Sequence, residues 1–131
     1  MSGPTKARPQ RSRSEPQPSP PGITISEAVS GRRVELHLAG DLDAWSSDKL
    51  DDYIRRHEEQ GAAEIRIDLR RLVFIDAAGV GTLVGAARRA GAGGWRLSLA
   101  NAQGLVARVI QLTQLEEMID HWQKPAGAPR A

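Results

Sequence analysis

The chain contains no cysteine and only five aromatic residues other than histidine, and these absences limit what it can do. Without cysteine it has no disulfide, no thiolate nucleophile and no cysteine-ligated zinc or iron–sulfur site. No apolar run approaches the roughly 20 residues that a membrane-spanning helix requires, and the N-terminus lacks the apolar stretch of a signal peptide. The sequence therefore predicts a cytoplasmic protein without membrane insertion.

The positive charge of the chain is confined to its N-terminal tail. The pI is near 9.5, which taken alone would suggest a nucleic-acid partner. In residues 1–22, however, four cationic side chains face only Glu15, so that this segment carries +3. Because the whole chain is +2, the remaining residues carry −1, and a nucleic-acid partner is not favoured.

Composition divides the chain into one domain and two tails. Residues 1–22 combine most of the eight prolines with Ser, Arg and Gln, a composition that buries too little apolar surface to fold. We predict a disordered basic tail there and a second disordered tail over residues 125–131. The single folded domain then spans residues 23–124.

Inside this domain, strand-like and helix-like periods alternate. Ile23–Ser30 and Arg33–Gly40 show the two-residue period of an antiparallel hairpin, with Val34, Leu36 and Leu38 on one face. A helix is predicted over Ala44–Gln60, because Leu50, Tyr53, Ile54 and His57 share one face. Its predicted N-cap is Asp43 or Ser46, and Gly61 is its predicted stop.

The second half repeats the alternation. Glu64–Leu69 reads as a strand that Arg70 and Arg71 interrupt before Leu72–Ile75 leads into Asp76, and a helix follows until Gly91–Gly94. Three further elements are predicted: a strand at Trp95–Ala100, a helix opened near Asn101 and striped by Leu105, Val106, Val109, Ile110 and Leu112, and a short closing strand within Met118–Trp122. This order indicates an α/β domain with a small, mostly parallel sheet entered through one hairpin.

The segment FIDAAGVG stands where such sheets carry their functional surface, beyond the carboxyl end of a strand. Asp76 can cap the following helix, and the small residues Ala77, Ala78 and Gly79 leave the helix tip flat. Gly79 and Gly81 allow the helix start to lie close to the sheet or to a partner's backbone. GDLD, residues 40–43, is a second strand-to-helix turn.

No catalytic, metal or cofactor site emerges from the motifs. A dinucleotide fingerprint would need a third glycine at Val84, and no Gly-Lys-Ser/Thr sequence completes a phosphate loop. His37, His57 and His121 read as surface or boundary residues, and Asp41 and Asp43 as helix caps. Trp95 and Trp122 read as packing residues and Trp45 as a contact at the helix start. The chain is therefore expected to be no enzyme and to hold no cofactor or metal.

Three segments, taken with the order of the elements, are informative: GDLD, RIDLRRLVFIDAAGVGTLV and LVARVIQLTQL. In these segments the chain closely resembles the STAS family, specifically the stand-alone anti-sigma-factor antagonists of bacteria. The resemblance covers about residues 23–122. It implies a STAS-like single domain with three to four helices largely on one side of the sheet. It also implies a partner, an anti-sigma factor of the histidine-kinase-like ATPase type, and leaves a homodimer open.

The resemblance assigns a role to each residue of the FIDAAGVG turn. The family's usual turn reads Asp-Ser-Ser-Gly, and its first serine is the residue that the kinase phosphorylates. Asp76, Ala78 and Gly79 match the family's pattern of an aspartate, a small residue and a glycine, whereas Ala77 stands in place of the phosphoacceptor. The partner-binding set implied by the resemblance is Asp43, Asp76, Ala77, Ala78, Gly79, Val80 and Thr82.

Two departures from the family pattern follow. Ala77 has no hydroxyl, so we expect a protein held in the binding-competent form, with Thr82 as a weak substitute acceptor. The chain also runs from LTQL almost directly into its proline-containing tail, so we expect no final helix. Two alternative functions stay open: a STAS subunit of a larger assembly, such as a stress-signalling complex or a lipid transporter, and a nucleotide-binding protein.

Overall fold

The fold was obtained as a computed structural model, which describes residues 22–119 and 121–122. The elements follow in the order β1 (Ile23–Ser30), β2 (Arg33–Leu42), α1 (Ser47–Glu59), β3 (Glu64–Ile75), α2 (Ala77–Gly93), β4 (Arg96–Ala100), α3 (Gly104–Leu112), the 3₁₀ helix η2 (Leu115–Met118) and β5 (His121–Trp122). The two predicted disordered tails fall almost entirely outside the described residues. Among the described residues, no helix has the length and apolarity needed to cross a membrane.

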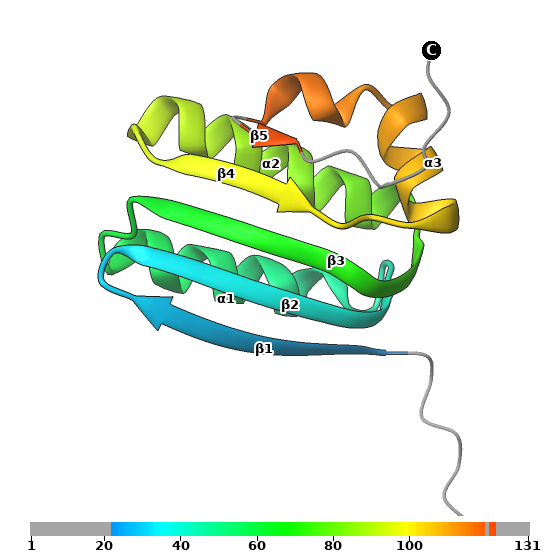
Figure 1. The fold of residues 1–131 in the computed structure, drawn as a ribbon, viewed down its shortest axis with the longest axis horizontal. Helices are drawn as coiled ribbons and strands as arrows, with labels where there is room; N and C mark the ends of the chain where they lie inside the picture. The colour runs from blue at the N-terminus through cyan, green and yellow to red at the C-terminus, as the bar shows by residue number, and fades with distance from the viewer. Residues whose placement is uncertain (1–21, 120, 123–131) are drawn as a thin grey trace, which may run out of the picture.

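The strands form one mixed sheet in the order β1-β2-β3-β4-β5. β1 and β2 pair antiparallel, and each later neighbour pairs parallel. The hairpin turn needs glycine at Gly31, whose φ is 61°. This confirms the mixed, mostly parallel sheet entered through a hairpin, and Figure 1 shows α1 and α2 together on one side of it.

Alternating strand residues and the apolar stripes of the helices build a single core. Val34, Leu36 and Leu38 of β2 are buried, as the two-residue period predicts, and Ile65, Ile67 and Leu69 of β3 lie beside them. Leu50 and Ile54 of α1, Leu83 and Ala87 of α2, and Val106 and Ile110 of α3 belong to the same cluster. The helices thus cover the apolar face of the sheet.

The predicted break in β3 is wrong. Arg70 and Arg71 lie within one continuous strand, Glu64–Ile75, whose pairing with β2 shifts register twice. The second shift places Val73 opposite no residue of β2, so that Leu72 and Ile75 both reach the core while Val73 and Phe74 stay exposed. The two arginines therefore mark a bulged segment of the strand rather than a loop.

The helix ends differ from prediction at two places. α1 begins at Ser47 rather than Ala44, because residues 44–46 form a turn. Asn101 is not the N-cap of α3, which starts after Gln103; Asn101 instead adopts a φ of 64°, and its amide nitrogen donates to Asp68 at 2.8 Å.

At the C-terminal end of the domain, the closing strand is confirmed as the two-residue β5. Leu105 and Leu112, predicted as part of the buried stripe of α3, are 51% and 71% exposed. The stripe predicted for α3 is thus only partly buried, through Val106 and Ile110.

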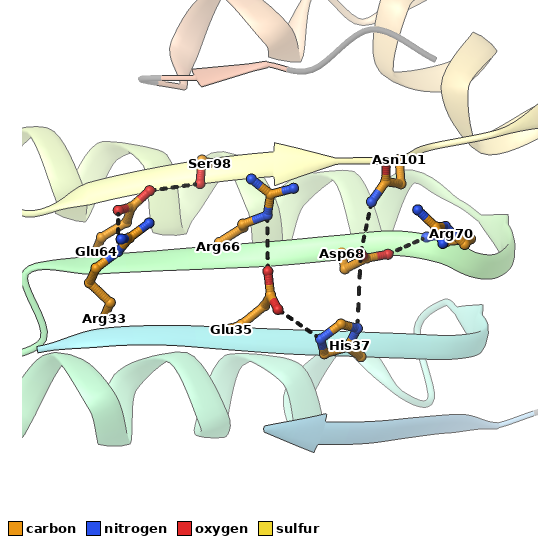
Figure 2. A network of polar contacts seen from close by, with 9 residues as sticks. All are labelled: Arg33, Glu35, His37, Glu64, Arg66, Asp68, Arg70, Ser98 and Asn101. Carbon is orange, nitrogen blue, oxygen red and sulfur yellow. Dashed lines mark hydrogen bonds and ion pairs between the residues drawn. The ribbon is translucent and has the colours of Figure 1, made fainter. Parts of the chain in front are cut away.

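The other face of the sheet carries a network of charged and polar side chains (Figure 2). Arg33 pairs with Glu64 at 3.2 Å, and Arg66 pairs with Glu35 at 3.0 Å, across β2 and β3. The network also includes His37, Asp68, Arg70, Ser98 and Asn101. We call these nine residues the open-face network; its contacts lie both between neighbouring strands and within β2 and β3.

Candidate functional site

Two strand-to-helix turns leave the sheet side by side. Leu42 and Ile75 are paired in the parallel ladder, so Asp43 and Asp76, which follow them directly, emerge at the same edge. The backbone N–H of Asp76 donates to the carbonyl oxygen of Leu42 at 3.2 Å and ties the two turns together. We call this edge, residues 43–46 and 73–79, the carboxyl edge.

Asp76 is the N-cap of α2, as predicted. Its Oδ1 accepts hydrogen bonds from the N–H groups of Ala78 at 2.9 Å and Gly79 at 3.1 Å, and its backbone is extended as an N-cap requires. These amides are the ones that would otherwise attract an anion to the helix start. With a carboxylate already bound to them, this helix end offers little to a phosphate group.

Gly79 and Gly81 have different structural roles. A Cβ at Gly79 would lie 2.6 Å from the carbonyl oxygen of Leu42 and 2.8 Å from Cγ1 of Ile75, whereas a Cβ at Gly81 would meet nothing within 4 Å. Gly79 is therefore the residue that lets α2 pack directly against the end of β2. Gly81 leaves open space on the helix surface.

The Asp43 turn is held by its own hydrogen bonds. Oδ1 of Asp43 accepts from the N–H groups of Trp45 at 2.9 Å and Ser46 at 3.1 Å. In return, Oγ of Ser46 accepts from the N–H of Asp43 at 3.0 Å and donates to the carbonyl oxygen of Asp41 at 2.7 Å. Both predicted cap residues thus participate, although Ser46, which holds the N-cap position, makes no side-chain capping bond to α1.

The remaining predicted site residues lie on α2. Ala77 is exposed at the helix tip, whereas Ala78, Val80 and Thr82 are half-buried. Val80 packs against the core and so helps to hold the start of α2 in place. Thr82 lines a groove between α1 and α2, and its hydroxyl makes no hydrogen bond to any described residue. A hydrogen bond from this hydroxyl to the backbone of its own helix, which is common for a helical threonine, is therefore not formed among the described residues.

This groove is a feature that the sequence reasoning missed. Small α2 residues, Ala78, Gly81 and Gly85, form one wall with Thr82, and Asp48, Asp51 and Arg55 of α1 form the other. Arg89 closes it by donating to Glu58 at 2.8 Å and to Asp51 at 3.2 Å. The only signal in the sequence was the i, i+4 spacing of Asp51 and Arg55, whose side chains lie 2.7 Å apart.

Asp51 also sets the charge of the groove. Its hydrogen bond to the Arg55 guanidinium, followed by its negative charge, raises the pKa of Arg55 above the ordinary arginine value. Since arginine is already charged at any physiological pH, this shift does not change the charge of Arg55.

The two histidines whose side chains the structure describes contact different carboxylates. His37 contacts Glu35 at 3.0 Å in the open-face network, and buried His57 of α1 contacts Glu27 of β1 at 2.6 Å. The His121 side chain lies outside the described side chains. Among the described residues, no three His, Asp or Glu side chains are grouped as a metal site would need.

The chain belongs to the STAS family. The family model described as "Mlab, STAS domain" matches residues 25–120. The anti-sigma-B factor antagonist of Bacillus subtilis (strain 168) is 30% identical over 105 residues, which cover 80% of this chain and 95% of that protein.

Solved structures support the same assignment. The anti-sigma factor antagonist SpoIIAA in its unphosphorylated form is 28% identical with a TM-score of 0.65, over 75% of this chain and 87% of that one. The phosphorylated form of Bacillus SpoIIAA is 27% identical with a TM-score of 0.60, over 75% and 90%. The resemblance of the sequence to STAS proteins and the predicted fold class are thereby confirmed, and the described relatives are regulatory binding proteins.

Proposed function

We propose that this protein is an anti-sigma-factor antagonist that binds an anti-sigma factor of the histidine-kinase-like ATPase type through its carboxyl edge and thereby releases sigma factor. The name shared by its relatives supports this role. So does the geometry: a capped, flat helix tip with exposed Ala77 offers a surface on which a second protein can dock. In this proposal Asp43, Asp76, Ala77, Ala78, Gly79, Val80 and Thr82 form or support the contact.

The observation that carries the regulatory part of the proposal is the exposed methyl group of Ala77. A phosphate at this position would add about −1.5 to −2 charges. It would stand beside Asp76, whose carboxylate already accepts hydrogen bonds from the N–H groups of Ala78 and Gly79. Repulsion between the phosphate and this carboxylate, together with the loss of phosphate solvation, would oppose docking. Alanine cannot accept that phosphate, so the protein stays competent to bind.

The test uses the purified full chain with each histidine-kinase-like anti-sigma factor of its source bacterium and ATP. We expect a stable complex, displacement of sigma factor and no phosphate on the antagonist by intact-mass measurement. Stoichiometric phosphorylation accompanied by loss of the complex would overturn the regulatory part. Failure to bind any of these anti-sigma factors would overturn the proposed function as a whole.

An Ala77→Asp variant places the negative charge without a kinase. We expect it to weaken the complex by about 1 to 3 kcal/mol, as for a charge left badly paired in an interface. Ala77→Asn, of nearly the same size and without charge, is the matched control. Equal affinities for the two variants would show that size, and not charge, decides docking.

A second role is favoured by one observation, the family model's own description, "Mlab, STAS domain". Under this alternative the chain is a subunit of a larger assembly, such as a stress-signalling complex or a lipid transporter. Recovery of a transporter or scaffold subunit in place of an anti-sigma factor, with the purified components re-forming the complex, would select it. A nucleotide-binding role is disfavoured, because the Asp76 carboxylate holds the amides at the start of α2.

A further inference from the structure

Trp45 stands out among the aromatic residues of the described chain. It is 87% exposed, whereas Trp95 is buried in the core and Tyr53 packs against it. An exposed tryptophan keeps a large apolar surface in water, and burial of that surface in a partner is among the largest single gains that an interface can make. Its position, in the turn between β2 and α1, needs no tryptophan for packing.

The turn that carries Trp45 is ordered before any partner arrives. The backbone N–H of Trp45 is bound to Oδ1 of Asp43, and Ser46 is bound on both sides, to Asp43 and to the carbonyl oxygen of Asp41. A side chain presented from a fixed backbone loses less conformational freedom on binding than one on a loose loop. The backbone at Trp45 is therefore held in place by hydrogen bonds within the turn.

Further exposed apolar residues lie at the same edge. Val73 and Phe74, 67% and 39% exposed, lie near the end of β3, directly before its final residue Ile75. Phe74 is paired with Asp41 in the ladder, one strand position from the end of β2 that leads into the Trp45 turn. Exposed apolar residues thus occur in both segments of the carboxyl edge, the one with Trp45 and the one that leads to Ala77.

The segment that carries Trp45 is acidic in sequence, although Asp51 in it pairs with Arg55 and Arg89. Residues 41–52 contain five aspartates and a single lysine, and Nζ of that Lys49 donates to the carbonyl oxygen of Ile23 on β1. Asp48 and Asp52 are exposed. An acidic rim around an apolar anchor is complementary to an apolar pocket with lysine or arginine at its mouth.

Resting on the proposed function, we propose that Trp45 is the principal anchor of this protein on its anti-sigma factor, inserted into an apolar pocket with a cationic rim. In this proposal the residue at position 77 decides whether the carboxyl edge can dock on the anti-sigma factor, and Trp45 supplies most of the binding affinity. The acidic residues beside Trp45 speed the encounter and select a partner with the matching rim.

The test compares Trp45→Ala, Trp45→Phe and wild type for binding to the purified anti-sigma factor by titration calorimetry. Val29→Ala is the control: Val29 is 60% exposed but is paired with Val34 at the opposite end of the sheet. We expect Trp45→Ala to weaken binding about 30-fold or more, Trp45→Phe to weaken it less, and Val29→Ala to leave it unchanged. Urea unfolding should give all variants wild-type stability.

Two outcomes separate the anchor from the proposed function. If wild type binds and Trp45→Ala binds equally well, the anchor is overturned and the function stands; if wild type binds no anti-sigma factor, both are overturned. Asp48→Asn with Asp52→Asn should slow association several-fold at low salt and by less at high salt. An association rate that is independent of both charge and salt would contradict the cationic rim.

Discussion

The open face of the sheet and the carboxyl edge differ in where their exposed groups find partners. On the open face, Glu35 and Glu64 each contact a cation from a neighbouring strand, and Asp68 accepts from Asn101. At the carboxyl edge, Trp45 and Ala77 are exposed, while the aspartates beside them turn inward to cap backbone amides. Glu35, Glu64 and Asp68 are thus paired within the described residues, whereas the edge leaves apolar surface for another molecule to cover.

This difference separates substitutions that should alter stability alone from those that should alter docking. Changes on the open face should cost stability in proportion to the burial of the groups involved and leave partner affinity unchanged. Changes at the edge should affect affinity, and stability only where the residue also fastens a helix to the sheet.

Gly79 should give the largest change in stability, because it fastens α2 to β2. Gly79→Ala places a methyl group 2.6 Å from the carbonyl oxygen of Leu42, so helix and strand must separate. We expect a loss of about 1 to 3 kcal/mol in the free energy of unfolding, together with weaker docking. Gly81→Ala, with open space around it, should instead be neutral or stabilise by up to about 1 kcal/mol. Urea denaturation of the pair measures both, and equal stabilities would refute the close packing.

Asp76 should come next, because its carboxylate accepts two hydrogen bonds from the first turn of α2. Asp76→Ala should lower the free energy of unfolding by about 0.5 to 2 kcal/mol. Asp76→Asn, which keeps a capping oxygen, should retain most of the stability. A calorimetric comparison of the two variants separates the cap from the charge, and an Asn variant as unstable as the Ala variant would contradict the capping role.

Asp68 should have a smaller effect on stability and none on docking. Its Oδ2 accepts from Asn101 at 2.8 Å and its Oδ1 from the N–H of Arg70 at 2.8 Å, and Asp68→Ala removes both. We expect a loss of about 0.5 to 1.5 kcal/mol in thermal or urea unfolding and an unchanged affinity for the anti-sigma factor. A weakened complex would place the open face within the interface.

Arg33 should have the smallest effect. Its side chain is 73% exposed although it lies 3.2 Å from Glu64, so water and salt screen the pair. Arg33→Ala should change the free energy of unfolding by no more than about 1 kcal/mol. Urea denaturation at low and high salt checks this, and a loss beyond that range would mean that the network acts as one unit.

Local patterns were enough to predict the parts of the fold that depend on neighbours in sequence. The hairpin, the crossover order and the Asp76 cap all follow from residues within a few positions of one another. The exposure of Ala77 also agrees with the predicted helix tip. Such features obey short-range rules of period and capping.

The features that prediction missed depend on contacts between distant segments. The role of Gly79 depends on Leu42, 37 positions earlier, and the two glycines of the turn read alike until that contact is known. Arg70 and Arg71 stay in β3 because pairing with β2 continues through the bulge. Asn101 looked like a helix cap but turns its amide to Asp68, in a neighbouring strand.

If residue 77 sets the switch, a serine at this position should restore it, and the Ala77→Ser variant shows whether it does. The affinity of wild type and of this variant for the anti-sigma kinase is measured with and without hydrolysable ATP. We predict equal binding without ATP; with ATP, the serine variant should gain one phosphate and lose the complex, while wild type stays bound and unmodified. Release of wild type by ATP to the same extent as the variant would show that residue 77 does not set the switch.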